Sequence, residues 1–350
     1  MTDRDELEMT EPAAVIKSSA SPTTIGARVS EPVSSEPRPI EARGLVKRYG
    51  AATAVDRVDL SVDRGDIYGF LGPNGAGKTT TLRMLLALIR RDAGSIRLFG
   101  RDPAEDPIAA LTGVAGIIEE PRLYPYLSGR ANLELLAALD RSGAGRTQID
   151  AVLEQVELRE RAKDRVADYS QGMRQRLGIA SCLIRRPRLL LLDEPANGVD
   201  PAGIRFLRAL LRQLADQGMT ILLSSHLLAE VQEVCNRVAV INLGRIVHEG
   251  ALVDLAATAA PRYRLRATDA ARAAAALGTL EGVHELRREQ NELSFTLAGD
   301  RDAVALTRVL SEAGVGIREL VREQARLEEL FFRLTETEAD APATKAVAAA

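Results

Sequence analysis

A glycine-rich segment that ends in lysine and threonine constrains this chain more than any other feature. Residues 72–80 read Gly-Pro-Asn-Gly-Ala-Gly-Lys-Thr-Thr. They match the pattern G-x-x-x-x-G-K-[ST], in which backbone N–H groups surround phosphate oxygens. An apolar run at 66–71 precedes the segment, and a helical pattern at 78–90 follows it. This context predicts a phosphate site between a buried strand and a helix N-terminus.

The residue types of this loop suit separate tasks. Glycines allow the backbone to turn toward an anion, Lys78 is predicted to hold the β- and γ-phosphates, and Thr79 to offer its hydroxyl to Mg²⁺. The alternative is a glycine turn that happens to precede a lysine, and the loop alone leaves many reactions open. The predicted nucleotide-binding residues of the loop are Gly72, Pro73, Asn74, Gly75, Ala76, Gly77, Lys78, Thr79 and Thr80.

Two carboxylates follow a second apolar run. Residues 189–192 are four leucines, and Asp193, Glu194 and a proline come next. A carboxylate at the C-terminal end of a parallel strand beside a phosphate loop is suited to holding Mg²⁺, which we assign to Asp193. Glu194 is predicted to polarise an attacking water. On its own, the same pattern is also that of an ordinary acidic strand exit.

Apolar runs and helical patterns alternate along the chain, which predicts an α/β fold with a mainly parallel sheet. Predicted strands lie at 55–62, 189–192, 220–224 and 237–242, and a predicted helix lies at 203–217. An alanine-rich stretch and Pro261 follow at 256–261 and are interpreted as a linker. Beyond it, alternation at 263–266 and 293–297 and helical patterns at 270–277 and 302–312 predict a small C-terminal α+β domain.

The predicted organisation has four parts. Residues 1–38 are rich in Ser, Thr, Pro and Glu and are predicted to be a disordered extension. Residues 39–255 form the nucleotide-binding domain and 262–335 the small α+β domain. Residues 336–350 are predicted to be a disordered tail.

Composition excludes several classes of protein. The 350 residues carry 46 basic and 49 acidic side chains, for a net charge of −3, which argues against nucleic-acid binding. Cys182 and Cys235 are too few for a disulfide scaffold and are interpreted as small buried residues in a reducing compartment. The three histidines have no cysteine pair beside them, so zinc is not expected. We expect no signal peptide and no membrane span, and therefore a cytoplasmic chain that reaches a membrane only through a partner.

Further motifs, in order, resemble the ATP-binding cassette family of transport ATPases over about residues 40–255. Tyr169-Ser-Gln-Gly-Met173 is similar to the family signature, Leu-Ser-Gly-Gly-Gln, and residues 174–180 continue the pattern. Residues 197–200, Asn-Gly-Val-Asp, resemble the loop that links two nucleotide sites. Residues 224–226, Ser-Ser-His, resemble the segment that carries the family's switch histidine. Tyr49, before the first predicted strand, resembles the aromatic residue that stacks on adenine. The resemblance implies a P-loop NTPase fold with a helical signature subdomain.

The resemblance also implies roles for individual residues. His226 would sense the γ-phosphate, and Ser170, Gly172 and Asp200 would contact nucleotide across a dimer. Glu119 stands where the family has a Mg²⁺-contacting glutamine, so it is predicted as a catalytic and metal-contacting residue. Each has a plainer alternative: Tyr49 as simple packing, His226 as a structural residue, and Ser170 with Gly172 as a helix cap.

Gln171 and Met173 depart from the signature, and Glu119 lies in a Glu-Glu-Pro stretch similar to that of bacitracin-resistance-type exporters. The resemblance implies an ATP- and Mg²⁺-dependent cassette that dimerises head to tail with a second copy or a homologue. It would work on the inner face of the cell membrane with an ABC-2-like permease. The segment at 122–168 is predicted to be mainly helical, and the resemblance implies that it contacts that permease. The alternative is that residues 123–127 are ordinary core.

The predicted function is ATP-driven export of a drug, antibiotic or lipid-like compound. The C-terminal domain, with residues 326–334, resembles the appendage of drug export ATPases. The alternatives are a cytosolic cassette ATPase that acts on ribosomes or DNA, and an importer subunit. A single copy of each motif, and no heptad run between Lys78 and Asp193, argue against the first alternative. The Glu-Glu-Pro stretch and the C-terminal domain argue against the second.

Overall fold

The computed structural model describes residues 36–139, 143–252, 254, 262–280, 282–297, 303–323 and 331. Most of the predicted disordered extension, the linker at 256–261 and the whole predicted tail at 336–350 lie outside the described residues. Of residues 326–334, only Phe331 is described.

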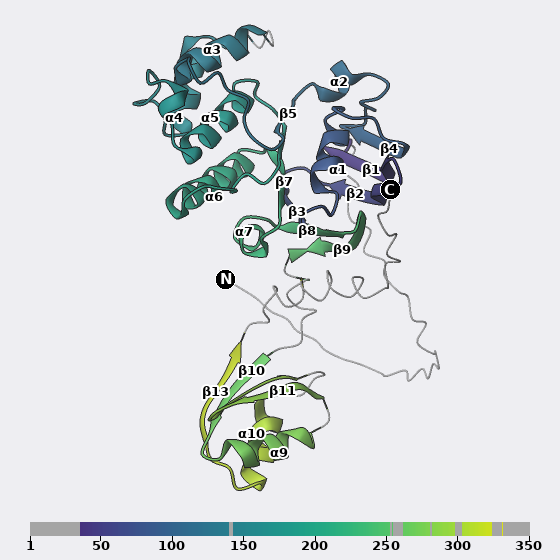
Figure 1. Ribbon diagram of the computed structural model, residues 1–350, viewed down its shortest axis with the longest axis vertical. Helices are drawn as coiled ribbons and strands as arrows, with labels where there is room; N and C mark the ends of the chain where they lie inside the picture. Colours follow the sequence, from purple (N-terminus) through teal and green to yellow (C-terminus); the bar gives the residue numbers. More distant parts are fainter. Residues whose placement is uncertain are drawn as a thin grey trace, which may run out of the picture. The chain divides into compact units, whose positions relative to one another are not determined.

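The strands between Ile67 and Ala251 include six that form one sheet (Figure 1). Its order is β5 (Val114–Ile117), β6 (Leu189–Leu192), β7 (Thr220–Ser225), β3 (Ile67–Leu71), β8 (Arg237–Asn242) and β9 (Arg245–Ala251). The first five strands pair in parallel and β9 pairs antiparallel with β8. The prediction of a mainly parallel sheet is therefore confirmed.

The central strands are apolar on both faces because both faces are covered. Every residue of β3, β6 and β7 is buried. Alternate residues of β6 enter two different cores: Leu190 and Leu192 pack in one, Leu189 and Leu191 in the other. This is the period-two alternation of a strand between two layers, and it explains the continuous leucine run.

A three-stranded antiparallel sheet supplies the second layer on one face. Its order is β2 (Ala52–Val62), β1 (Ile40–Tyr49) and β4 (Ala93–Leu98). It shares a core with α1 (Lys78–Leu85), whose helix ends five residues before the predicted end because Ala87 adopts a φ of 55°. Tyr49 is the last residue of β1, so its predicted position before the first strand was wrong.

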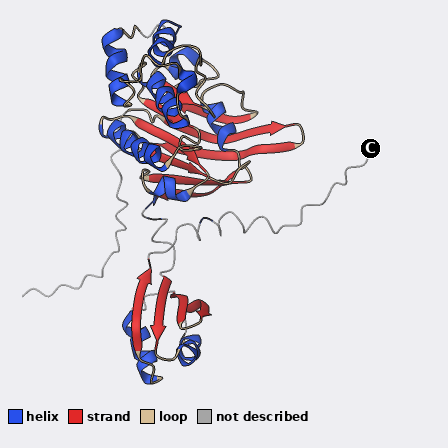
Figure 2. Ribbon diagram, turned by 60° about the vertical axis from the view of Figure 1, so that its left-hand side comes forward, coloured by secondary structure: helices blue, strands red, loops and turns tan. Residues whose placement is uncertain are grey.

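Helices occupy most of the chain between β5 and β6. They are α3 (Gly129–Leu139), α4 (Arg146–Gln155), a 3₁₀ turn at Val166–Asp168 and α5 (Gln171–Leu183). A short α2 (Pro107–Leu111) precedes β5, and α6 (Pro201–Asp216) and α7 (Leu228–Gln232) flank β7 in the sequence. Figure 2 shows these helices in blue beside the red strands. The helical content predicted for residues 122–168 is present as α3, α4 and the 3₁₀ turn.

The C-terminal part has a β-α-β-β-α-β order. It runs β10 (Arg262–Ala267), α9 (Ala270–Gly278), β11 (Val283–Glu289), β12 (Glu292–Leu297), α10 (Ala303–Glu312) and β13 (Ile317–Glu323). The sheet order is β11-β12-β10-β13, antiparallel throughout. Tyr263 stacks on Phe295 in its own core. This is a split βαβ arrangement, and it confirms the predicted α+β fold class.

Both cysteines are buried, as predicted. Burial raises the pKa of the Cys182 thiol to about 12 and also raises that of Cys235. Neither thiol therefore ionises near neutral pH, and both act as small apolar residues. Every helix in the described ranges is too short or too polar to cross a membrane.

Leu191 lies in the middle of β6 with no exposed surface. We expect Leu191→Ala to lower the free energy of unfolding by about 2–5 kcal/mol, since it leaves a cavity in a close-packed core. Urea unfolding measures the change. Leu139→Ala, the same substitution at a 66% exposed position, is the control and should change stability by no more than about 0.5 kcal/mol. Equal effects for both variants would contradict the assignment of β6 to the core.

Candidate functional site

Parallel strands that are neighbours in the sheet bring together motifs that are far apart in the sequence. β7 lies between β6 and β3 in the sheet. The C-terminal end of β6 leads into Asp193 and that of β7 into His226. The C-terminal end of β3 leads into the loop that begins at Gly72. The carboxyl ends of parallel strands meet at one edge of a sheet, where ligands of such folds bind. The site is therefore built at this edge.

The phosphate loop keeps its shape through glycine. Gly77 is the N-cap of α1 with a φ of 108°, a backbone conformation that side chains disfavour. A Cβ at Gly77 would lie well inside van der Waals contact of the Ala54 carbonyl oxygen, and one at Gly72 would do the same to Ile241. The Gly72 N–H donates to the Ser225 carbonyl over 3.2 Å, which joins the loop to the end of β7.

Lys78 is almost completely buried, with 5% of its surface exposed. Its ammonium donates to the carbonyl oxygens of Gly72 (2.7 Å) and Pro73 (3.1 Å). It also forms an ion pair of 3.1 Å with Glu194 Oε1. A lysine ammonium has three N–H groups, and these three partners account for them. The ammonium is thus held between the backbone of the phosphate loop and the Glu194 carboxylate.

Asp193 is fixed through both of its carboxylate oxygens. Thr79 donates its hydroxyl to Oδ2 over 2.8 Å, and Ser224 donates its hydroxyl to Oδ1 over 2.6 Å. A hydroxyl oxygen beside a carboxylate is the type of ligand set that Mg²⁺ accepts. The described residues hold no cluster of three or more side chains that would coordinate a metal by themselves. These two side chains therefore fit a cation that takes its other ligands from phosphate and water.

Glu194 links the lysine to the histidine. Its Oε2 lies 2.7 Å from His226 Nδ1, while its Oε1 pairs with Lys78. Its backbone has a φ of 48°, and its N–H donates to Ser224 Oγ over 2.9 Å. The side chain is one-fifth exposed, so water can reach it. A partly exposed carboxylate beside a histidine and an ammonium is suited to act as a base toward water.

The remaining predicted residues lie apart from this cluster. Tyr49 has a half-exposed ring with the Lys47 ammonium 5.5 Å from its centroid. Glu119 has a φ of 62° and pairs with Arg83 of α1 over 2.6 Å. No hydrogen bond or ion pair between described residues joins Tyr49 or Glu119 to Lys78, Asp193, Glu194 or His226. Their contacts with nucleotide and metal stay predictions.

The signature and linking residues serve as helix caps in the folded chain. Ser170 is the N-cap of α5 and accepts the Met173 N–H over 3.2 Å. Asp200 is the N-cap of α6 and accepts the Gly203 N–H over 3.1 Å. The cap proposed as an alternative for Ser170 is therefore present. A helix N-terminus is also a place where an anion can bind, so the cap is compatible with the predicted phosphate contact.

Sequence analysis missed one residue of the cluster. Ser224 contacts both Asp193 and Glu194, yet it was noted only as part of the motif before His226. The available signal was a hydroxyl that directly follows the apolar residues 221–223. A buried hydroxyl needs a hydrogen-bond partner, and the nearest strand end supplies two.

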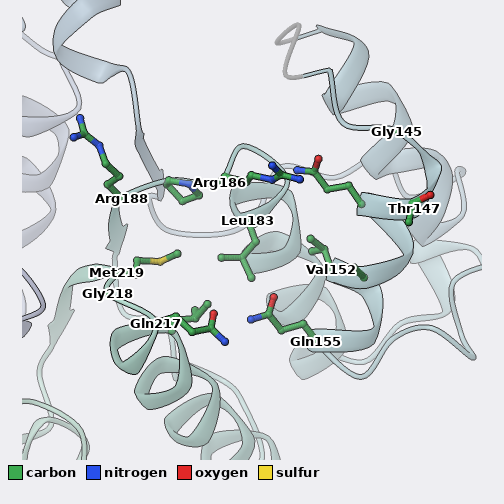
Figure 3. A pocket seen from close by; sticks show the side chains of 14 residues that line it. Gly145, Thr147, Val152, Gln155, Leu183, Arg186, Arg188, Gln217, Gly218 and Met219 are labelled. Atoms are coloured by element: carbon green, nitrogen blue, oxygen red, sulfur yellow. The ribbon is translucent and has the colours of Figure 1, made fainter.

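A separate groove of about 700 Å³ lies between the helical part and α6. Figure 3 shows Val152 and Gln155 of α4 on one side and Gln217 and Met219 on the other. None of its lining residues belongs to the cluster around Lys78. The groove is therefore not part of the phosphate site.

The fold and the arrangement of Lys78, Thr79 and Asp193 define a P-loop nucleotide-binding protein. Comparison with known proteins identifies its family. The ABC transporter family model matches residues 55–197. The bacitracin transport ATP-binding protein BcrA of Bacillus licheniformis is 35% identical over 296 residues, which cover 84% of this chain and 96% of that protein. The daunorubicin resistance ATP-binding protein DrrA3 of Streptomyces coeruleorubidus is 37% identical over 302 residues, 85% and 95% of the two chains.

A solved structure of an ATP binding subunit of an ABC transporter aligns with a TM-score of 0.56 and 30% identity, covering 62% of this chain and 91% of that one. The chain belongs to the ABC transporter family as an ATP-binding subunit that hydrolyses ATP to drive transport. As such a subunit, it works with a membrane permease. The family resemblance predicted from the sequence is confirmed.

The geometry of Gly77 predicts that an added methyl group is not tolerated. Gly77→Ala places a side chain in the left-handed region and against the Ala54 carbonyl, so we expect a loss of at least about 1–2 kcal/mol in stability and weaker ATP binding. Thermal unfolding and a nucleotide-binding titration measure both. Gly145→Ala is the control, because Gly145 has a φ of −80° and open space around it. Equal effects of the two changes would refute this role of Gly77.

Proposed function

We propose that this chain powers the export of a drug, antibiotic or lipid-like compound through a separate ABC-2-type permease. The observation that carries the catalytic part is the cluster in which Lys78, Glu194 and His226 lie within hydrogen-bond distance in series.

Nucleotide binding begins at Lys78. Its buried ammonium is the charge that the β- and γ-phosphates would contact, and the residues of the loop from Gly72 to Thr80 surround it. A γ-phosphate at this position competes with the Glu194 carboxylate for the ammonium. Binding of ATP therefore frees Glu194 from Lys78, while its contact with His226 can persist. Tyr49, exposed at the end of β1, is assigned to stacking on adenine.

Thr79 and Asp193 would hold Mg²⁺, and Glu119 would approach it from the end of β5 after leaving Arg83. The cation supplies charge neutralisation for the phosphates when bound. The Thr79 hydroxyl and the Asp193 carboxylate are already 2.8 Å apart, so one cation could contact both oxygens.

Glu194 acts as the general base. Its carboxylate accepts a proton from water as the water oxygen attacks the γ-phosphorus, and the bond from that phosphorus to the oxygen of ADP breaks. His226 is assigned to orienting the carboxylate, which the contact at 2.7 Å supports, and to sensing the γ-phosphate. Proton removal and orientation are thus divided between two side chains on neighbouring strand ends.

A second cassette completes the site. Ser170, Gly172 and Asp200 are the residues that we assign to the nucleotide of the opposite subunit. In the described ranges they make no hydrogen bond to Lys78, Asp193 or Glu194, and the chain has one copy of each motif. A second copy, or a homologous cassette, in head-to-tail orientation would bring them to the phosphates. ATP then bridges the two subunits and its hydrolysis separates them.

The names of the relatives support the direction and the substrate class. BcrA is a bacitracin transport protein and DrrA3 a daunorubicin resistance protein, and both align over most of their length. For the permease contact, Tyr124 and Tyr126 are exposed by 38% and 67% and their rings meet edge to face at 5.9 Å. Exposed aromatic residues favour a docking surface over ordinary core. The subunit would lie on the inner face of the cell membrane, with residues 39–255 as the ATPase domain and 262–335 as an accessory domain.

Export is tested by co-expression of this chain with the membrane protein encoded beside it. We expect the two to purify together and transported compounds to stimulate ATP hydrolysis. Tyr126→Ala should weaken the association, while Ile108→Ala, at an exposed site on α2 outside residues 122–168, should not. Purification of the chain alone, with no stimulated hydrolysis, would contradict the proposal.

Replacement of the base tests the assignment of Glu194. Glu194→Gln keeps the size of the side chain and removes its basicity, so turnover should fall by about 100- to 10,000-fold. ATP should still bind and should hold the protein as a dimer, which sedimentation in Mg²⁺ and ATP detects. Undiminished hydrolysis would remove Glu194 from this role.

Replacement of the buried cation tests the assignment of Lys78. Lys78→Ala removes the ammonium that the phosphates contact, and ATP binding measured by titration should be lost. Lys163→Ala is a matched control, since Lys163 is exposed between α4 and the 3₁₀ turn and belongs to none of the residues assigned to the nucleotide. Unchanged affinity in the Lys78 variant would refute the phosphate assignment.

A further inference from the structure

We propose that Ser224 is a positioning residue that orients both carboxylates of the catalytic site. The proposal rests on the roles of Asp193 and Glu194 given above and adds a residue to the machinery that acts through them. The Ser224 hydroxyl is the one group in the described site that contacts both acidic residues.

The geometry assigns two simultaneous hydrogen bonds to this hydroxyl. It donates to Asp193 Oδ1 over 2.6 Å and accepts the N–H of Glu194 over 2.9 Å. A serine hydroxyl has one donor and two acceptor positions, so it can serve both partners at once. Alanine could serve neither. Ser224 has no exposed surface, which leaves little room for water to replace it.

Each of the two bonds fixes a different property. The bond to Oδ1 sets the rotation of the Asp193 carboxylate and leaves Oδ2 directed at Thr79. The bond from the Glu194 N–H holds a residue whose φ of 48° is unfavourable for any residue except glycine. That backbone conformation directs the Glu194 side chain toward Lys78 and His226. Ser224 thereby determines where both acidic groups point.

Ser224 also lies on the strand that carries the histidine. His226 follows it by two residues, and the Ser225 carbonyl accepts the Gly72 N–H. The end of β7 thus contacts the carboxylates and the phosphate loop together. The neighbouring Ser225 hydroxyl has other partners, the Leu227 N–H and the Glu230 carboxylate, so the two serines are not equivalent.

Ser224→Ala is the primary test. It removes the partner of Asp193 Oδ1 and leaves the Glu194 N–H unpaired. Loss of a residue that orients a metal-binding carboxylate costs about 10- to 100-fold in activity or metal affinity. We therefore expect kcat to fall by about 10- to 100-fold while the affinity for ATP, set by Lys78, changes little. Ser224→Thr retains the hydroxyl and should recover most of the lost turnover.

Thr220→Val is the matched control. Thr220 lies on the same strand, is 2% exposed and accepts the Gly65 N–H through its hydroxyl, far along β7 from the carboxylates. Its loss should lower the melting temperature to a similar degree as Ser224→Ala and leave kcat unchanged. A parallel loss of kcat in both variants would show that Ser224 contributes to stability alone and would overturn the proposal.

A second readout does not depend on hydrolysis. In the Glu194→Gln background, the Mg²⁺ concentration required for ATP-dependent dimerisation is measured by sedimentation. Addition of Ser224→Ala should raise it by about tenfold or more, because Asp193 loses its orientation. An unchanged Mg²⁺ requirement together with unchanged kcat in Ser224→Ala would overturn the inference. If Glu194→Gln itself retains hydrolysis, the proposed function fails first, so the two failures are distinguishable.

Discussion

The adjacency of three parallel strands is the constraint on which the rest of the site depends. β3, β7 and β6 are neighbours, and each ends at the same edge of the sheet with one functional element. The strands hold their positions because every one of their residues is buried between two cores. Burial therefore places Lys78, Asp193 and His226 together although long stretches of sequence separate them. The positions of the site residues at this edge therefore follow from the packing of the strands.

Within the site, an ion pair and two hydrogen bonds compensate the buried charge of Lys78. A buried ammonium is costly unless it is paired, and Lys78 has Glu194 and two carbonyl oxygens as partners. The same Glu194 contacts His226, so the carboxylate proposed as the general base is the one that also pairs with the lysine of the phosphate loop. A phosphate that takes over the ammonium changes the partners of Glu194. In the proposed mechanism, binding and hydrolysis would be linked through this single side chain.

The sequence was most informative where periodicity and burial agree. The leucine run of β6 and the phosphate loop were predicted with their positions, because they combine a local pattern with a required context. The strands β1, β4, β5, β9, β11 and β13 were not predicted. In β11, charged residues such as Arg287 and Arg288 obscure the alternation, and β5 has only four residues. Ser224 was missed because its importance lies in contacts with residues 30 positions away. The contacts proposed for Ser170 and Asp200 across a dimer stay predictions, because they depend on a second chain.

If a second cassette completes each nucleotide site, turnover must depend on protein concentration. The specific ATPase activity of the purified chain is measured over a dilution series in saturating ATP and Mg²⁺, with sedimentation at the same concentrations. We expect the specific activity to fall as dimers dissociate. Constant specific activity in solutions that contain only monomers would show that one chain completes the site alone, and would contradict it.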